Sequence, residues 1–170
     1  MNPVDSVAYR LALTGAIDIA ATAVAGGVID IRAPRGIVWD SLATVENWPE
    51  IRADISDVVA AGPARTGASF TWHAAGTPVT SVFALSDRPS RLAWATTAPG
   101  FFMVAVYQFD ELGPDHTRIR CQESMNGTAV PPGIDHDVLA ELIRTWLKGI
   151  SKFVDHRLSQ SGTAEPSTIT

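Results

Sequence analysis

The sequence predicts an α+β fold in which a curved antiparallel sheet of about seven strands wraps around one long C-terminal helix. The first observation is a series of short segments of alternating polarity, separated by turn residues at intervals of about 8 to 12 residues. The second is an apolar stripe at helical spacing near the C-terminus. The third is a pair of short helical segments after the first strand, which completes the predicted order of elements.

The first predicted strand, Val28 to Ala33, leads into two short helices. One begins at Pro34, a residue well suited to the first helical position, and the other spans about Pro49 to Ala53. Glycine and proline pairs then separate each strand from the next, which predicts an antiparallel meander. The strands of this meander are predicted at Ile55 to Ala61, Ala68 to Ala75, Pro78 to Leu85, Arg91 to Thr97, Phe101 to Glu111 and Thr117 to Met125.

The final helix is predicted from about Asp135 to Leu158. Acidic residues lie in its first turns and basic residues toward its end, which suits the helix dipole. A stripe this wide requires a broad apolar partner, and the concave face of the sheet supplies one. The stripe consists of Val138, Leu142, Trp146, Ile150 and Phe153, with Leu139, Ile143 and Val154 beside it.

The two ends of the chain differ from this central region. We expect an N-terminal extension at 1–25, a single domain at 26–158 and a flexible tail at 159–170, where Ser, Thr, Gly and Pro leave little to bury. Within the extension, a short helix is predicted at Val4 to Leu13. The residues after it fit either a strand or a helix. The extension either covers the cavity, forms a contact in a homodimer or stays loose.

The composition restricts where the protein is expected to be located and what it is expected to bind. Asp18 interrupts the apolar run Leu11 to Ala25, which is also too short to span a bilayer, so we expect a cytoplasmic protein without a membrane span. The formal net charge of −5 and the scattered basic residues argue against nucleic-acid binding. A single cysteine, Cys121, excludes an intrachain disulfide and the usual zinc spacings. No phosphate-binding or dinucleotide motif is present, so we expect neither cofactor nor metal.

Strand alternation assigns the two faces of the sheet. On the last strand, His116, Arg118 and Arg120 share one face and must face solvent, so Cys121 and Glu123 face inward. The same alternation on the other strands predicts an interior rich in aromatic residues. These inward residues are Phe70, Trp72, Ser81, Phe83, Leu85, Leu92, Trp94, Thr96, Met103, Ala105, Tyr107, Phe109 and Met125. They form either a solid core or the wall of a pocket.

Several local motifs, in their order along the chain, resemble the SRPBCC superfamily, also called START-like or Bet v 1-like, and within it the polyketide cyclase/dehydrase branch. The resemblance covers about 28–158 and implies the helix-grip fold of that superfamily. At Ala105 this chain departs from many relatives, which carry a histidine there, so chemistry that depends on that imidazole is not expected. The motifs lie at Ile29 to Trp39, Val45 to Glu50, Arg88 to Trp94, Tyr107 to Glu111, Thr117 to Ile119 and Glu123 to Gly127.

Glu123 and Tyr107 are the predicted catalytic residues. A carboxylate on an interior face has its pKa raised by desolvation, which suits a general acid or base near neutral pH. The alternative is a structural Glu123 that pairs with Arg157 or a backbone donor, or that lies in water at the open end of the sheet. Tyr107 either polarises a ligand carbonyl or is a core aromatic whose hydroxyl is satisfied.

The resemblance and the aromatic interior together predict that the chain binds an apolar, polyketide-like or polycyclic small molecule. Catalysis, if present, would be cofactor-free cyclisation or dehydration. The alternatives are a carrier or sensor of a lipid or quinone, and a protein-interaction module with a cavity too small for a ligand. The predicted ligand-binding residues are Trp48, Phe70, Trp72, Phe83, Trp94, Met103, Ala105, Cys121, Met125, Leu142 and Trp146.

Overall fold

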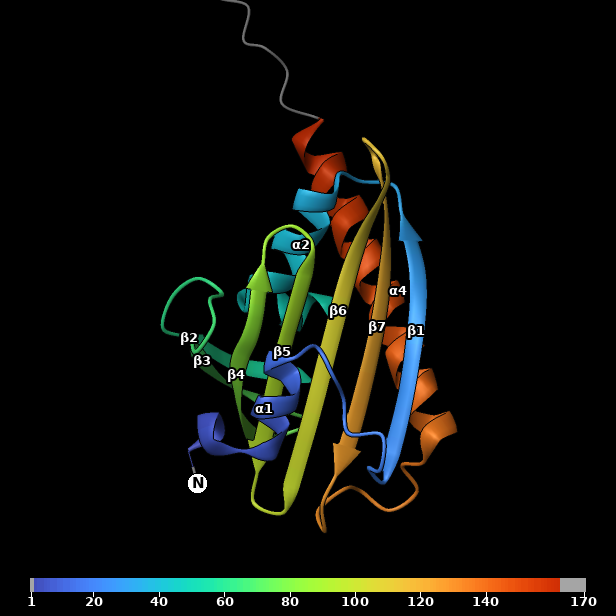
Figure 1. Ribbon diagram of the computed structural model, residues 1–170. Helices are drawn as coiled ribbons and strands as arrows, with labels where there is room; N and C mark the ends of the chain where they lie inside the picture. The colour runs from blue at the N-terminus through green and yellow to red at the C-terminus, as the bar shows by residue number, and fades with distance from the viewer. Residues whose placement is uncertain (1, 163–170) are drawn as a thin grey trace, which may run out of the picture.

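The computed structural model describes residues 2–162. Its centre is a sheet of seven antiparallel strands in the order β1-β7-β6-β5-β4-β3-β2, so that β2 to β7 form a meander and β1 joins at the β7 edge (Figure 1). This confirms the predicted fold class. The strands are β1 (Ala23–Ile31), β2 (Ile55–Ala60), β3 (Ser69–Ala74), β4 (Thr77–Asp87), β5 (Arg91–Ala98), β6 (Phe101–Gly113) and β7 (His116–Asn126).

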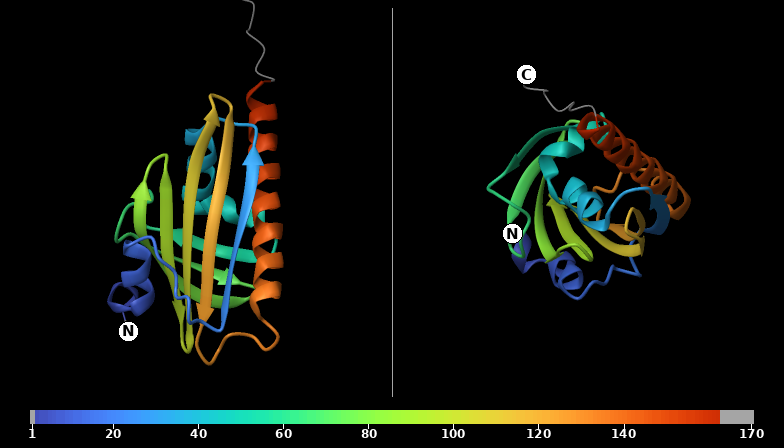
Figure 2. Two further views of the ribbon diagram at one scale, coloured as in Figure 1. Left: turned by 45° about the vertical axis from the view of Figure 1, so that its right-hand side comes forward. Right: turned by 90° about the horizontal axis from the view of Figure 1, so that it is seen from above.

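The long helix α4 (His136–Ser161) runs along the concave side of the sheet, and the sheet curves around it when viewed from above (Figure 2). Asp135 caps its start, because its side chain accepts a hydrogen bond from the Val138 amide at 2.9 Å. The helix extends beyond the predicted Leu158, and 163–170 of the predicted tail lie outside the described residues. Seven residues are buried along it, namely Leu139, Ile143, Trp146, Leu147, Ile150, Phe153 and Val154.

Two members of the predicted helical stripe are not buried. Val138 and Leu142 are 38% and 40% exposed, respectively. The buried face is centred on Leu139, Ile143 and Trp146, and residues 138 and 142 each lie one position away from that line, on its flank. The prediction that both belong to the buried stripe was therefore wrong.

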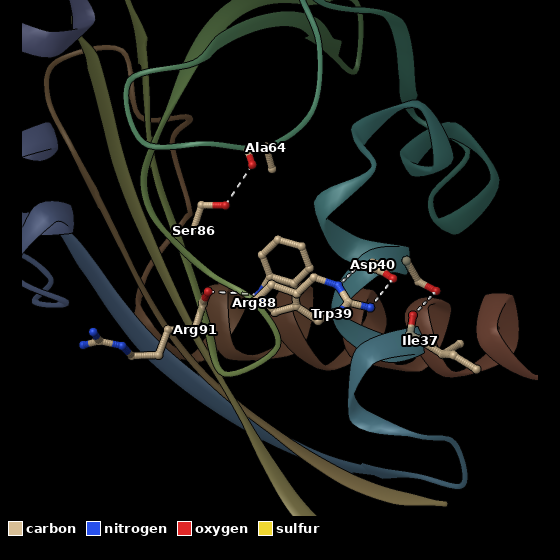
Figure 3. A network of polar contacts seen from close by, with 8 residues as sticks. Ile37, Trp39, Asp40, Ala64, Ser86, Arg88 and Arg91 are labelled. Atoms are coloured by element: carbon tan, nitrogen blue, oxygen red, sulfur yellow. Dashed lines mark hydrogen bonds and ion pairs between the residues drawn. The ribbon is translucent and has the colours of Figure 1, made fainter.

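Two short helices, α2 (Arg35–Ala43) and α3 (Trp48–Ile51), follow β1 as predicted, with the 3-10 turn η2 (Val45–Asn47) between them. α2 is joined to the β4–β5 hairpin, where the Trp39 indole donates to the Arg91 carbonyl at 3.0 Å and Arg88 binds Asp40 through two hydrogen bonds (Figure 3). α3 lies against α4 at Gly149, where an added Cβ would come within 2.5 Å of the Ile51 carbonyl oxygen. This close approach requires glycine and fixes α3 beside the long helix.

Strand β1 begins at Ala23, five residues before the predicted start at Val28. The strand contains Gly26 and Gly27, which obscure the alternation in the sequence. Gly27 has a packing reason, because an added Cβ would come within 2.8 Å of Ile143 and 2.9 Å of Leu147 on α4. A larger residue here would require these side chains to shift, so glycine lets the edge strand lie close to the helix.

The N-terminal segment lies on the outer face of the sheet, opposite α4 (Figure 2). After the 3-10 turn η1 (Pro3–Asp5), helix α1 (Val7–Leu13) buries Ala8, Tyr9 and Ala12. They form a second apolar cluster with outward residues of β4, β5 and β6, namely Val82, Ala84, Ala93, Ala95 and Val104. Of the three alternatives for 1–25, covering the cavity does not apply to α1, because the sheet lies between α1 and the side that faces α4.

Leu85 also packs in this outer cluster, although alternation predicts it to face inward. The register between β4 and β5 shifts between Phe83 and Leu85, and this irregularity reverses the facing of the strand from Leu85 onward. The inward prediction for Leu85 was wrong for this reason.

None of the helices among residues 2–162 is both long and apolar enough to cross a membrane.

Candidate functional site

A cavity of about 800 Å³ lies between the concave face of the sheet and the first half of α4. This volume is in the range of small-molecule binding sites. The wall is formed by α3 and the start of β2, by inward residues of β3 to β7, by the segment after β7 and by α4. Most of the side chains are apolar or aromatic, and the ionisable ones are Arg52, Asp54 and Glu123.

Seven of the eleven predicted ligand-binding residues line this cavity: Trp48, Trp72, Trp94, Met103, Met125, Leu142 and Trp146. Phe70, Phe83, Ala105 and Cys121 do not line it. Phe70 and Phe83 pack against each other with ring centroids 4.8 Å apart, behind the wall. Ala105 and Cys121 are buried in the core beneath the lining residues. The pocket interpretation of the inward face therefore holds for one part of that face and the solid-core interpretation for the rest.

Four tryptophans meet at one side of the cavity. The ring of Trp48 is centred 5.5 Å from Trp72, 5.2 Å from Trp94 and 5.6 Å from Trp146. Its indole nitrogen donates to the Leu42 carbonyl at 2.9 Å, which fixes the ring between α2 and the sheet. Because each tryptophan supports another, this part of the wall is rigid and offers broad aromatic surface to a flat ligand.

Glu123 lies on the wall at the β7 position opposite Ala25 of β1 and Ala105 of β6. It is 6% exposed. Burial raises the pKa of its carboxyl above the ordinary value for glutamate, and the Tyr107 hydroxyl, which donates to Oε1 at 2.7 Å, partly offsets this rise. Glu123 is thus an interior carboxyl, as its position on the strand predicted, and the structure adds that Tyr107 holds one of its oxygens.

The structural alternative in which Arg157 pairs with Glu123 is wrong. Arg157 contacts the side chains of Glu50 and Asn47 and stacks over the Phe153 ring, with its guanidinium carbon 4.9 Å from the ring centroid. The described partner of the Glu123 side chain is Tyr107 instead. Among residues 2–162 no cation forms an ion pair with this carboxyl, although the charge of Arg52 acts on it and lowers its pKa slightly against the effect of burial.

Tyr107 is fully buried and does not line the cavity. Its ring stacks on Trp94 with centroids 5.0 Å apart, and its hydroxyl points to Glu123. Burial, together with the neighbouring charge of Glu123, raises the pKa of the hydroxyl well above its usual value, so the group stays protonated and remains a donor. Tyr107 is accordingly placed to orient Glu123, and its hydroxyl is not presented to a ligand.

Cys121 lies next to Tyr107 in the ladder between β6 and β7. Burial raises the pKa of its thiol to about 12, so it is not a thiolate at neutral pH. Among residues 2–162 there is also no group of three or more His, Cys, Asp or Glu side chains that could hold a metal ion. Glu123 is therefore the side chain of the inner wall that can exchange a proton with a ligand.

Sequence reasoning missed Arg52 and Asp54, which both line the cavity between α3 and β2. They form an ion pair with 2.5 Å between Arg52 Nε and Asp54 Oδ1, and the Arg52 guanidinium lies 5.7 Å from the Trp146 ring centroid. Both side chains are substantially exposed, so the pair marks the solvent side of the cavity. Its signal in the sequence was weak, because Arg52 was predicted near the end of a short helix and Asp54 in the connection that follows, and charged residues at such places usually face water.

Comparison with known proteins places this architecture in a family. Residues 17–160 match the family described as "Polyketide cyclase / dehydrase and lipid transport". The chain belongs to this family. The assignment confirms the resemblance carried by the sequence motifs, and both activities in the description act on hydrophobic molecules, which indicates a hydrophobic ligand. No match was found among curated proteins.

Solved structures show the same fold at low identity. A START superfamily protein from Mycobacterium smegmatis is 14% identical, with a TM-score of 0.58 over 81% of this chain and 97% of that one. Norcoclaurine synthase from Thalictrum flavum, solved with dopamine and hydroxybenzaldehyde, is 15% identical, with a TM-score of 0.56 over 78% and 86%. The di-domain ARO/CYC protein StfQ of the steffimycin biosynthetic pathway is 17% identical, with a TM-score of 0.62 over 80% of this chain and 46% of that one.

Proposed function

We propose that this protein binds an apolar, polyketide-like or polycyclic molecule in the cavity and catalyses its cofactor-free cyclisation or dehydration, with Glu123 as general acid and base. The observation that carries the proposal is a buried carboxyl on the inner wall of an otherwise aromatic cavity. A group used only for stability would normally be paired or exposed, since burying a carboxylate without a cation is costly.

The chemistry needs one group that both takes and gives a proton. In a dehydration, the Glu123 carboxylate takes a proton from the carbon next to a ketone, and the bond to the hydroxyl on the following carbon breaks. The same carboxyl then returns the proton to the departing hydroxyl, which leaves as water, so no further reactant is required. Burial raises the pKa of this carboxyl, which moves its titration in the direction that suits a group that both takes and gives a proton.

Cyclisation uses the same proton balance. Glu123 takes a proton from carbon, the new carbon–carbon bond forms to a second carbonyl of the same chain, and the proton goes to that carbonyl oxygen. The cavity contributes by holding a flexible substrate in a folded shape, which removes much of the entropy cost of ring closure. Tyr107 contributes as a positioning residue, because its hydroxyl fixes one carboxyl oxygen of Glu123, whose side chain lines the cavity.

A non-catalytic carrier of a lipid or quinone is the second candidate. The family description includes lipid transport, and a cavity with few polar groups suits a ligand that is only held. The protein-interaction module has less support, because it requires a cavity too small for a ligand and the cavity measures about 800 Å³.

The test has two steps. Native mass spectrometry of protein purified from its own host identifies any bound small molecule. A β-hydroxy ketone bearing a phenyl ring then serves as a probe, since its dehydration to a conjugated enone is followed by absorbance. We expect Glu123→Gln to lower turnover by about two to four orders of magnitude.

Asp54→Asn is the matched control, because it also removes a cavity carboxylate but at the exposed side, and we expect it to keep most of the activity. Binding of the probe without product in the unmodified protein would support the carrier. Equal turnover in Glu123→Gln and the unmodified protein would remove Glu123 from the mechanism.

A further inference from the structure

A short chain of hydrogen bonds ends at the cavity wall on β5. The Trp72 indole nitrogen donates to Ser81 Oγ at 2.9 Å, and Ser81 Oγ lies 2.7 Å from Thr96 Oγ1. Ser81 has no exposed surface and Thr96 is 1% exposed. Thr96 lines the cavity and Ser81 does not, so Thr96 is the end of the chain that a ligand can reach.

The number of hydroxyl hydrogens indicates which group donates and which accepts in this series of hydrogen bonds. An indole nitrogen only donates, so Ser81 Oγ accepts from Trp72. If Thr96 also donated to Ser81, the Ser81 hydrogen would be buried without an acceptor, because these are the hydrogen bonds that the Ser81 side chain makes among residues 2–162. Leaving a buried donor unpaired costs about 1–3 kcal/mol. Either direction leaves one hydroxyl hydrogen over, but only Thr96 lines the cavity, where a ligand can accept it. The favoured arrangement therefore has Ser81 donating to Thr96, with the Thr96 hydrogen left over.

The surroundings of Thr96 provide no acceptor for that hydrogen. Its side chain makes one hydrogen bond within 2–162, the one to Ser81. Its ladder neighbour on β6 is Met103, and the next residue across on β7 is Met125, both of which line the cavity with apolar side chains. A donor in such a place forms a stronger hydrogen bond than one in water, because nothing competes for it.

We propose that Thr96 donates its hydroxyl hydrogen to an oxygen of the ligand, and that this ligand is a ketone or quinone rather than a hydrocarbon or simple lipid chain. The inference rests on the proposed binding in the cavity and names the ligand class for it. Thr96 and Glu123 lie two strands apart and two ladder positions apart, on the order of 10 Å between Cα atoms. They therefore contact different parts of one extended molecule.

A pair of probes isolates the carbonyl. Fluorene and fluorenone share a flat three-ring skeleton, and fluorenone adds one ketone oxygen. Equilibrium dialysis measures the affinity of each for the unmodified protein and for Thr96→Val, which keeps the shape of the side chain but removes the hydroxyl. We expect Thr96→Val to weaken fluorenone binding about five- to tenfold and to leave fluorene binding unchanged.

Two further variants control for folding. Thr97→Val changes the next residue, whose side chain lies on the other face of β5, and we expect it to leave both affinities unchanged. Thr96→Ser restores a hydroxyl at the site, and we expect it to recover most of the fluorenone affinity. Infrared difference spectra add a direct readout, since the carbonyl band of bound fluorenone should lie at lower frequency in the unmodified protein than in Thr96→Val.

The outcomes distinguish a failure of the Thr96 proposal from a failure of the proposed ligand binding in the cavity. If the unmodified protein binds fluorene and fluorenone equally well, or if Thr96→Val weakens both alike, the cavity binds ligands and the role of Thr96 is wrong. If neither probe binds, the proposed binding in the cavity fails, and the inference fails with it. A selective loss of fluorenone affinity, restored in Thr96→Ser, supports it.

Discussion

The two halves of α4 carry the same apolar stripe but meet very different surroundings. In the second half, Ile150, Phe153 and Val154 are buried in the continuous core. In the first half, Leu142, Ile143 and Trp146 line the cavity, together with Leu139. The contrast shows that the helix does not define the cavity by itself, because its sequence is similarly apolar along both halves.

The difference comes from what lies between helix and sheet. At one end, α2 and α3 fill the space beneath the sheet, and Gly149 allows α3 to approach α4 closely. At the other end none of the helices within 2–162 fills this space. The β3–β4 and β5–β6 connections and the segment after β7 form the wall there instead. Short helices inserted after β1 thus divide one amphipathic interface into a packed core and a binding site.

The largest effect is expected in the packed half. Ile150 is fully buried, and Ile150→Ala should lower the free energy of unfolding by about 2–5 kcal/mol, because it removes apolar contacts and leaves a void that dense packing cannot close. Urea denaturation followed by circular dichroism measures the change. A loss below about 1 kcal/mol would mean that this half is as loosely filled as the cavity half and would remove the contrast.

A smaller effect, with a distinctive pH dependence, is expected at Glu123. Its folded-state pKa is raised by burial, so between the unfolded and folded pKa values the folded protein holds a proton that the unfolded chain has released. Its contribution to stability is therefore most favourable below the unfolded pKa, declines as pH rises and levels off above the folded pKa. Each pKa unit by which folding raises the Glu123 value corresponds to about 1.4 kcal/mol in the free energy of unfolding.

Glu123→Gln removes this titration while keeping the shape of the side chain. We expect the variant to match the parent protein in stability at acid pH and to exceed it at neutral and higher pH, measured as the difference between their urea unfolding curves across a pH series. Exposed carboxyls cancel in that difference. A parent protein that gains stability relative to the variant as pH rises would show that the Glu123 pKa is lowered by folding, contrary to its burial.

The order and type of the elements were predictable because each strand and the final helix has its own periodicity. The misassignments have local causes that lie outside the pattern. Gly26 and Gly27 hide the start of β1, and Gly27 has its packing reason in a close approach to α4, which is distant in sequence. Leu85 changes face at a register shift, and one irregularity in a strand reverses every later position.

The candidate site was predictable to the extent that it depends on strand faces. Glu123 was found because it interrupts an apolar face, and its pairing with Tyr107 follows from their nearness on adjacent strands. Which inward residues line a cavity and which fill a core was not predictable, since both sets are equally apolar. That distinction separates Trp72 from Phe70 on the same strand, and it depends on how far α3 extends beneath the sheet.

The smallest effect on stability is expected at Leu142, the counterpart of Ile150 in the cavity half. Leu142 is 40% exposed and lines the cavity, so Leu142→Ala creates no new enclosed void and should change the free energy of unfolding by less than about 1 kcal/mol. Fluorenone affinity, measured by equilibrium dialysis, should nevertheless fall, because the ligand loses an apolar contact that the folded protein does not need for itself. Ile150→Ala should show the opposite profile, with a large loss of stability and little change in affinity while the protein remains folded. If Leu142→Ala were as destabilising as Ile150→Ala, Leu142 would belong to the core, and the boundary between packing and binding along α4 would lie nearer the start of the helix.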